Sequence, residues 1–386
     1  MLDTVALTLE RRQFEIVDCE RFSPSARGLM QPPFYRLGAR GNFSCVLNPT
    51  QADYEAGRYR PRLTLTKRKA QAGFSLKLRI EFSAPKLLFG NNFDELRTCD
   101  FERVLDALHR ELSGMGVRVD RATLRRAPVS AIHYSKNIAF TDYTTCSMVM
   151  NELGRINLSQ RLDLSHTDYR NEGHAIRYHT NSYEVTFYDK IRDLQKARVS
   201  EKRAFEKDYG AQIDFFTKPN GFPKQLEVLR MEVRLSNRTK IRALLKQLGI
   251  REKPQFDALF SADIAQRILL HFWEAVRRQL PLVCDAKIPR PEEILQGLVT
   301  ASGGITRPGK LLQQVGGILL VRAIGVRGLG ALLRPHCSPR TWQRAKRELS
   351  RLKVADGGTF SALKGIDAIL RDFQPVRLKD FQIGTS

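Results

Sequence analysis

The residues best suited to chemistry lie on the polar sides of three alternating segments, and strict alternation is typical of a strand with one buried face. The polar positions carry Glu81 in the first segment, Tyr188 in the second and Glu232 in the third. Carboxylates can hold a divalent cation, and a tyrosine hydroxyl can attack phosphorus. The pattern therefore predicts a metal-assisted site for phosphodiester cleavage on one face of a sheet. The segments are residues 76–82, 183–188 and 229–235.

A fourth segment, residues 129–138, places His133 among its polar positions. An imidazole beside two carboxylates makes a mixed ligand set, and the nitrogen shifts preference from magnesium toward manganese. Each residue alone also has an ordinary structural interpretation: Glu232 can form a cross-strand ion pair, Tyr188 can pack in a half-buried position, and a histidine can simply be hydrogen bonded. If His133 is not a ligand, the third contact is expected among His174, His179 and Glu184.

The net charge predicts a nucleic acid partner. The 386 residues contain 64 Lys and Arg against 41 Asp and Glu, which gives +23. Such a surplus favours a polyanion, because each neutralised phosphate releases condensed counterions.

An anionic membrane is the alternative partner, but no apolar run reaches the roughly 18 residues of a spanning helix, and residues 1–14 are too charged for a signal peptide. The six cysteines lack zinc-ligand spacing, which favours reduced thiols in the cytoplasm.

The elements that position these residues predict an α+β fold. Residues 1–245 are expected to form an antiparallel-sheet domain that carries the phosphodiester-cleaving site, with helices covering one face, including a helix over 101–114. Residues 246–300 are expected to form a helical extension. Residues 301–386 are expected to form an all-helical basic DNA-binding region, because they hold 15 Lys and Arg against 5 Asp and Glu.

Within that region, Ser338-Pro339 is a sound N-cap and first-turn pair for a basic helix over residues 340–353. Such a helix suits the major groove or its flanking phosphates. Truncation near Ala301 is therefore expected to weaken duplex binding and to spare cleavage of single-stranded DNA. The predicted DNA-binding residues are Lys77, Arg79, Lys86, Arg230, Arg234, Arg340, Arg344, Lys346, Arg347 and Arg351.

Four sequence elements in order, spread over roughly residues 75–260, resemble the gene II replication proteins of filamentous phages, which are rolling-circle initiators. The first is Ser83-Ala84-Pro85-Lys86-Leu87-Leu88-Phe89-Gly90-Asn91-Asn92, and the second is Thr186-Phe187-Tyr188-Asp189-Lys190, with its Tyr-x-Lys element. The third is Val228-Leu229-Arg230-Met231-Glu232-Val233-Arg234-Leu235, and the fourth is a helix over 239–248 that ends at Gly249.

The resemblance implies a site-specific nicking–joining enzyme that depends on Mg²⁺ or Mn²⁺. Tyr188 would attack a phosphodiester at the origin, form a phosphotyrosine bond and free a 3′ hydroxyl, and a second transfer would close the displaced circle. Lys190 is expected to lower the pKa of Tyr188 or to neutralise phosphate oxygens. Glu81 and Glu232 match carboxylates of the family, whereas His133 stands where relatives have an aspartate.

The implied partners are double-stranded phage or episomal DNA at its origin, the single-stranded product, and a host helicase and polymerase in the host cytoplasm, with no membrane. Two other classes stay open: a non-enzymatic origin-binding initiator or repressor, and a plasmid-type replication or mobilisation nickase. A nick with covalently attached protein separates the enzymes from the binding protein. Tyr178 and Tyr183 compete with Tyr188 as the nucleophile.

Overall fold

One nine-stranded antiparallel sheet dominates the computed structural model, in the order β3-β4-β5-β1-β7-β11-β10-β9-β8. The structure describes residues 1–27, 43–70, 73–140, 144–155, 167–170, 175–179, 182–199, 226–278, 291–301, 307–351 and 361–381. The strands are β1 (Leu2–Glu10), β3 (Phe43–Leu47), β4 (Arg62–Ala70), β5 (Gly73–Ser83), β7 (Val129–Phe140), β8 (Thr167–Arg170), β9 (Ala175–His179), β10 (Tyr183–Asp189) and β11 (Glu227–Leu235). A separate pair joins β2 (Glu15–Ile16) to β6 (Val117–Arg118). The four segments predicted as strands are β5, β7, β10 and β11.

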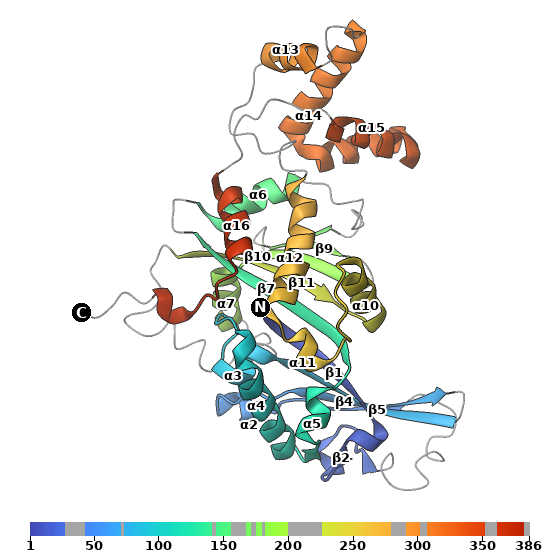
Figure 1. Cartoon of the computed structure of the whole chain (residues 1–386), viewed down its shortest axis with the longest axis vertical. Coiled ribbons are helices and arrows are strands. Elements are labelled where there is room, and N and C mark those ends of the chain that lie inside the picture. Colours follow the sequence, from blue (N-terminus) through green and yellow to red (C-terminus); the bar gives the residue numbers. More distant parts are fainter. Residues whose placement is uncertain are drawn as a thin grey trace, which may run out of the picture.

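The apolar side of the sheet is buried under helices, but the prediction of one open face is wrong for the central strands: β10 and β11 are buried on both sides, and α7 (Lys190–Val199) packs against Val228 on the polar side. The helices on the apolar side are α10 (Arg238–Gln247), α12 (Ala262–Arg277) and α16 (Ser361–Asp372), which lie in front of the sheet in Figure 1. The α12 rings pack directly on β10, with Trp273 6.4 Å from Phe187 and Phe272 5.5 Å from Tyr183 between ring centroids. Each fully buried large apolar side chain stabilises the fold by roughly 1.5–3 kcal/mol. The expected α+β class is confirmed.

A second group of helices lies near β1 and β5, and α3 (Ala84–Phe89) contacts both strands. The group consists of α2 (Gln51–Glu55), α3, α4 (Phe101–Gly114), α5 (Arg121–Arg125) and α11 (Phe256–Leu259). The predicted helix over 101–114 is α4, and its expected apolar positions Val104, Leu105, Leu108 and Leu112 are buried. The chain leaves α4 through Gly116 at φ +78°, where a Cβ would lie 2.9 Å from the Cβ of Asp18. Only glycine fits both constraints.

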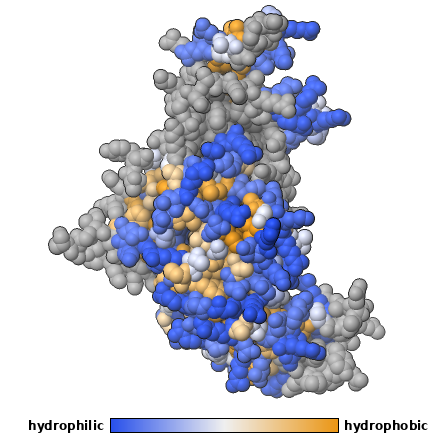
Figure 2. Space-filling view, viewed as in Figure 1, coloured by the Kyte–Doolittle hydropathy of each residue, from blue (hydrophilic) through white to orange (hydrophobic). Residues whose placement is uncertain are grey.

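Three further helices extend beyond the sheet and form one end of the molecule (Figure 1): α13 (Pro291–Ala301), α14 (Pro308–Leu333) and α15 (Pro339–Arg351). α14 contacts both of the others and also α6 (Cys146–Arg155). Trp342 of α15 is buried against Gly330, where an added Cβ would lie 2.9 Å from the indole. Hydrophilic residues cover much of the α15 region in the space-filling view (Figure 2). Within the described residues, none of these or other helices has the length and apolar character needed to cross a bilayer.

The C-terminal segment returns to the sheet. The Trp273 indole of α12 donates to Asp367 of α16 at 3.2 Å. Beyond α16, Val376 donates its N–H to the buried Glu95 carboxylate and accepts the Glu95 N–H at its carbonyl, both at 3.0 Å. Glu95 also binds the buried Lys136 of β7 at 2.5 Å. One continuous core therefore crosses the predicted boundaries at residues 245 and 301.

Candidate active site

Tyr188 and Glu232 meet on the polar side of neighbouring strands. Thr186 of β10 lies opposite Glu232 of β11, so Tyr188 is two residues away on the same face. The Tyr188 hydroxyl donates to Glu232 Oε2 at 3.2 Å. Tyr188 is 9% exposed and Glu232 is 1% exposed. The structure thus brings together two of the residues that the sequence singled out.

The other carboxylate oxygen of Glu232 is held by two nitrogens. Arg234 Nε lies 2.7 Å from Oε1, and His133 Nδ1 of β7 lies 3.4 Å from the same atom. Burial alone would raise the pKa of Glu232, but Arg234 and His133 outweigh it and hold that pKa well below its usual range. Glu232 is therefore ionised at neutral pH.

The Tyr188 phenol is neutral in this arrangement. Burial raises the pKa of Tyr188 well above its ordinary value; Arg230 opposes the rise and Glu232 adds to it. Lys190, the first residue of α7 (Lys190–Val199), is buried close to this phenol. Its Nζ binds Asn92 Oδ1 at 2.7 Å and lies 6.0 Å from the centroid of the Tyr188 ring. Lys190 is thus placed beside the phenol as predicted from the Tyr-x-Lys spacing, while burial keeps the pKa of Tyr188 raised.

Arg230 is a buried part of this cluster. Its guanidinium contacts the Asn92 carbonyl at 2.5 Å, Ser135 Oγ at 2.7 Å and Asp3 Oδ1 at 3.5 Å. With 2% of its surface exposed, Arg230 has no open side for a DNA backbone. The prediction that Arg230 binds DNA is therefore corrected: Arg230 orders the polar face.

Glu184 links the cluster to its solvent-facing side. One carboxylate oxygen binds Arg234 at 2.7 Å and the other binds Arg177 of β9 at 2.7 Å. The side chains of His133 and Arg234 are 24% and 36% exposed, so the cluster reaches solvent at these two residues. Arg177, Ser135, Asn92 and Asp3 were missed by sequence reasoning. The polar alternation of β7 and β9 was the available signal for Ser135 and Arg177.

Glu81 lies apart from the other two predicted ligands. It stands opposite Ala6 of β1, and β1 separates β5 from β7. Its carboxylate pairs with Arg79 on its own strand at 3.0 Å. Among the described residues, Glu81, His133 and Glu232 do not bring three ligand atoms together. Of the fallback residues, His179 lies opposite Glu184 on β9, and His174 lies outside the described residues.

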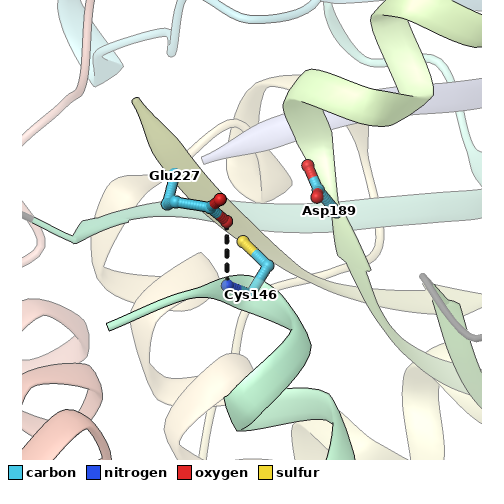
Figure 3. A group of neighbouring side chains, drawn as sticks. All are labelled: Cys146, Asp189 and Glu227. Carbon is cyan, nitrogen blue, oxygen red and sulfur yellow. Dashed lines mark hydrogen bonds between the residues drawn. The ribbon is translucent and has the colours of Figure 1, made fainter. Parts of the chain in front are cut away.

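A different group, Cys146, Asp189 and Glu227, places its potential ligand atoms within 4.8 Å of one another (Figure 3). Glu227 Oε2 accepts the Cys146 N–H at 2.9 Å at the start of α6. Asp189 Oδ1 accepts the Arg192 N–H at 2.9 Å at the start of α7. Burial, with Asp189 and Glu227, raises the pKa of the Cys146 thiol, which disfavours the thiolate that metals bind. We assign both carboxylates to capping helix N-termini.

The remaining predicted DNA-binding residues lie in two places. On β5, Lys77 pairs with Glu10 at 3.0 Å, and Arg79 donates to Ser130 as well as to Glu81. Lys86 lies in α3. On α15, Arg340, Arg344 and Arg347 are exposed, while the side chains of Lys346 and Arg351 are outside the description.

No family model, curated protein or solved structure matches this chain. The likeness to gene II-type proteins therefore depends on the four sequence elements named above. The same four elements are the basis for proposing a class of enzyme.

The lowered pKa of Glu232 predicts a pH-dependent contribution to stability. Because the folded pKa lies below the unfolded value of about 4.3, this contribution is complete above that value and is lost as pH falls toward the folded pKa. E232Q should lower the free energy of unfolding by about 2 kcal/mol near neutral pH, because the bonds from Arg234 and Tyr188 to a charged acceptor become bonds to a neutral amide, while Arg234 keeps Glu184 as an ion-pair partner. Urea unfolding should show this gap narrowing below about pH 4. The control is E252Q at an exposed position, whose free energy of unfolding should match that of the parent. A difference between E232Q and the parent that does not change with pH would contradict the ionised state assigned to Glu232.

Proposed function

We propose that this protein is a site-specific DNA nicking–joining endonuclease that starts and ends rolling-circle replication of phage DNA in the host cytoplasm. The observation that carries the proposal is the 3.2 Å contact between the Tyr188 hydroxyl and the ionised Glu232, within a cluster of arginines on the polar face of the sheet. A tyrosine with a carboxylate acceptor and nearby cations can perform transesterification of a phosphodiester.

In the reaction, the Tyr188 oxygen forms a bond to phosphorus and the bond from phosphorus to the 3′ oxygen breaks. Glu232 Oε2 is the nearest acceptor for the phenolic proton, and the leaving 3′ oxygen takes a proton from solvent. The products are a 5′ phosphotyrosine bond and a free 3′ hydroxyl. Attack by another 3′ hydroxyl on the same phosphorus reverses the step and joins the displaced strand.

The Tyr188 phenol must be activated to act as a nucleophile, because burial raises its pKa and disfavours the phenolate. A divalent cation, Mg²⁺ or Mn²⁺, would be held by His133 and Glu232, and it would supply Lewis acidity at the attacked phosphate. The donor set fits such an ion in part, since the imidazole nitrogen and a carboxylate oxygen already lie 3.4 Å apart. Arg234, on the exposed side, is placed to neutralise phosphate charge.

Three of the four sequence elements that carry the family resemblance meet at one residue. Asn92 comes from the first element; its side chain binds Lys190 of the second, and its carbonyl binds Arg230 of the third. Elements that are far apart in the chain thus converge beside Tyr188. This convergence supports the proposed relation to phage replication initiators and, through it, the proposed origin DNA, single-stranded product and host helicase and polymerase as partners.

The exposed arginines of α15 are proposed to bind duplex origin DNA. Replacing Arg340, Arg344 and Arg347 together by glutamine should weaken duplex binding and reduce the slope of log affinity against log salt by about 2.7, because each phosphate contact contributes about 0.9. Cleavage of a single-stranded origin oligonucleotide should be unchanged. The matched control replaces the exposed Arg110, Arg118 and Arg121, which lie at the opposite end of the molecule (Figure 1). Equal losses for both triple variants would contradict a specific role for α15.

Nicking of supercoiled DNA tests the proposed function. Incubation of the protein with a plasmid that carries its origin, with Mg²⁺ or Mn²⁺, should give open circles with covalently attached protein. The same plasmid without the origin is the control. Tight origin binding without a nick under either ion would favour the non-enzymatic initiator or repressor instead. Nicking of transfer-origin or plasmid replication-origin DNA alone would favour the plasmid-type alternative.

A further inference from the structure

Asn92 contacts both of the buried cations that lie beside Tyr188. Its side-chain oxygen accepts a hydrogen bond from Lys190 Nζ at 2.7 Å, and its backbone carbonyl accepts one from Arg230 at 2.5 Å. Arg230 stands directly opposite Tyr188 in the sheet, and the Lys190 ammonium lies 6.0 Å from the centroid of the Tyr188 ring. Because a lysine side chain has many rotamers, a fixed acceptor is needed to keep its ammonium in one place beside the phenol.

The turn that carries Asn92 is held on both sides of that residue. The side-chain oxygen of Asn91 accepts the N–H groups of Phe93 at 2.9 Å and Asp94 at 2.8 Å, which is the pattern of an Asx turn. Asn137 of β7 donates its side-chain N–H to the Phe93 carbonyl at 2.7 Å. These bonds set the position of Asn92 relative to the sheet.

Residues 373–378, which we call the C-terminal strap, follow α16 and return to this turn. Phe373 adopts φ +56°, a conformation that costs free energy in a bulky residue, so its presence indicates that the direction of the strap matters. The fully buried Lys136 lies 5.7 Å from the centroid of the Phe373 ring and donates to the Gln374 carbonyl at 2.6 Å. The same ammonium binds Glu95, so one buried cation joins the strap to the end of the turn.

The strap is also bonded directly to the turn. Val376 and Glu95 exchange two bonds of 3.0 Å, and Leu378 donates its N–H to Asp94 Oδ1 at 2.7 Å. The Leu378 side chain belongs to a buried apolar cluster that includes Ile191, the residue after Lys190, and the strap lies beside α7 in Figure 1. A continuous chain of contacts therefore runs from the strap through the turn to Lys190.

We propose that Asn92 is a positioning residue for the nicking reaction and that the C-terminal strap holds Asn92 in place. Asn92 keeps the Lys190 ammonium beside the Tyr188 phenol, where it neutralises charge that develops on the phenolate and the attacked phosphate. The inference rests on the proposed function and deepens it, because it names the residues that place Lys190 for that reaction. In the alternative, the strap only completes an apolar cluster and has no effect on Lys190.

Protection of Lys190 from an acylating reagent tests the positioning without DNA. In the parent, acylation of the buried Lys190 by acetic anhydride should be slow, with the exposed Lys246 as the internal reference in mass spectrometry. Asn92→Ala removes the acceptor, and Val376→Pro removes the N–H that donates to Glu95. Each should speed acylation of Lys190 about tenfold or more, because a lost bond favours local opening. Val376→Ala keeps that N–H and is the matched control, which should protect Lys190 like the parent.

The rate of adduct formation in a single turnover tests whether Asn92 acts through Lys190. Asn92→Ala keeps the carbonyl that binds Arg230, and it should slow adduct formation at saturating DNA roughly tenfold to a hundredfold without changing DNA affinity. In a chain that already carries Lys190→Met, Asn92→Ala should have no further effect, because the ammonium that it positions is absent. A residue that only stabilises the fold would have the same effect in both backgrounds.

Thermal unfolding shows whether each variant has folded. If Val376→Pro has not, Asp94→Ala is the second strap variant, because it removes the acceptor of the Leu378 N–H. Slow acylation of Lys190 in Asn92→Ala and in the folded strap variant, or equal slowing of adduct formation in both Lys190 backgrounds, would overturn the proposal. The proposed function can fail separately: acylation that depends on Asn92 and the strap, without any adduct in the parent, would preserve the placement of Lys190 and refute the nickase. Nicking by a parent whose Lys190 is not protected by Asn92 would do the reverse.

Discussion

Tyr188→Phe is expected to abolish the covalent DNA adduct while leaving the fold and DNA affinity intact. The change removes one hydroxyl, whose contact is the hydrogen bond to Glu232, so the free energy of unfolding should change by only about 1 kcal/mol. Loss of the nucleophile should lower nicking by about a thousandfold or more. A labelled origin oligonucleotide, followed by denaturing electrophoresis, measures the adduct, and filter binding measures the affinity.

The neighbouring tyrosines provide controls that are matched in chemistry. Tyr178 of β9 donates its hydroxyl to the Leu153 carbonyl at 2.6 Å and is buried. Tyr183 packs against Phe272 and Lys240 on the helix-covered side of the sheet. Neither hydroxyl is placed beside Glu232, so Tyr178→Phe and Tyr183→Phe should form adduct. If Tyr188→Phe still forms the adduct and Tyr178→Phe does not, the nucleophile is Tyr178 on β9, and the assignment of Tyr188 on β10 is wrong.

Removal of residues 361–386 is expected to unfold the protein and to abolish both duplex binding and cleavage. The deletion takes away the buried Ile366 and Leu370 and the Val376 backbone bonds to Glu95. Burial of the two aliphatic side chains alone is worth roughly 3–6 kcal/mol, which is comparable to the whole stability of many domains. Thermal unfolding followed by circular dichroism should show the loss of a cooperative transition.

The sequence predicts that truncation near Ala301 spares the cleavage of single-stranded DNA, and the position of α16 changes that prediction. Truncation near Ala301 would remove α16 as well as the basic helices, so single-stranded cleavage would be lost along with duplex binding. The α15 triple arginine variant keeps α16 and is the control, because it should retain a cooperative transition. A truncated protein that unfolds cooperatively and still cuts single strands would show that α16 is not part of the core.

The local elements could be predicted because their signals are local. The alternation of β5, β10 and β11 and the helical spacing of α4 follow from nearest neighbours along the chain. The strand order could not be predicted in the same way. β1 inserts between β5 and β7, and that long-range pairing separates Glu81 from His133 and brings Asp3 in.

For the candidate site, the face on which a residue lies could be predicted from the sequence, but its burial could not. Alternation placed Tyr188 and Glu232 on polar faces, and their contact follows once β10 and β11 pair. Alternation does not tell which polar positions are covered. Arg230 is buried because Asn92 and Asp3 close over it, whereas Arg79 on β5 remains partly open. Lys190 begins the helix α7, yet its Nζ still lies 6.0 Å from the centroid of the Tyr188 ring and binds Asn92.

Identification of the DNA-linked residue tests the central claim most directly. The parent protein, trapped with origin DNA and a divalent cation, is denatured, digested with nuclease and protease, and sequenced by mass spectrometry. The account predicts a single peptide in which Tyr188 carries a 5′ nucleotide phosphate. A nucleotide on another tyrosine or on a serine, or a nicked product with no linked peptide, would contradict it.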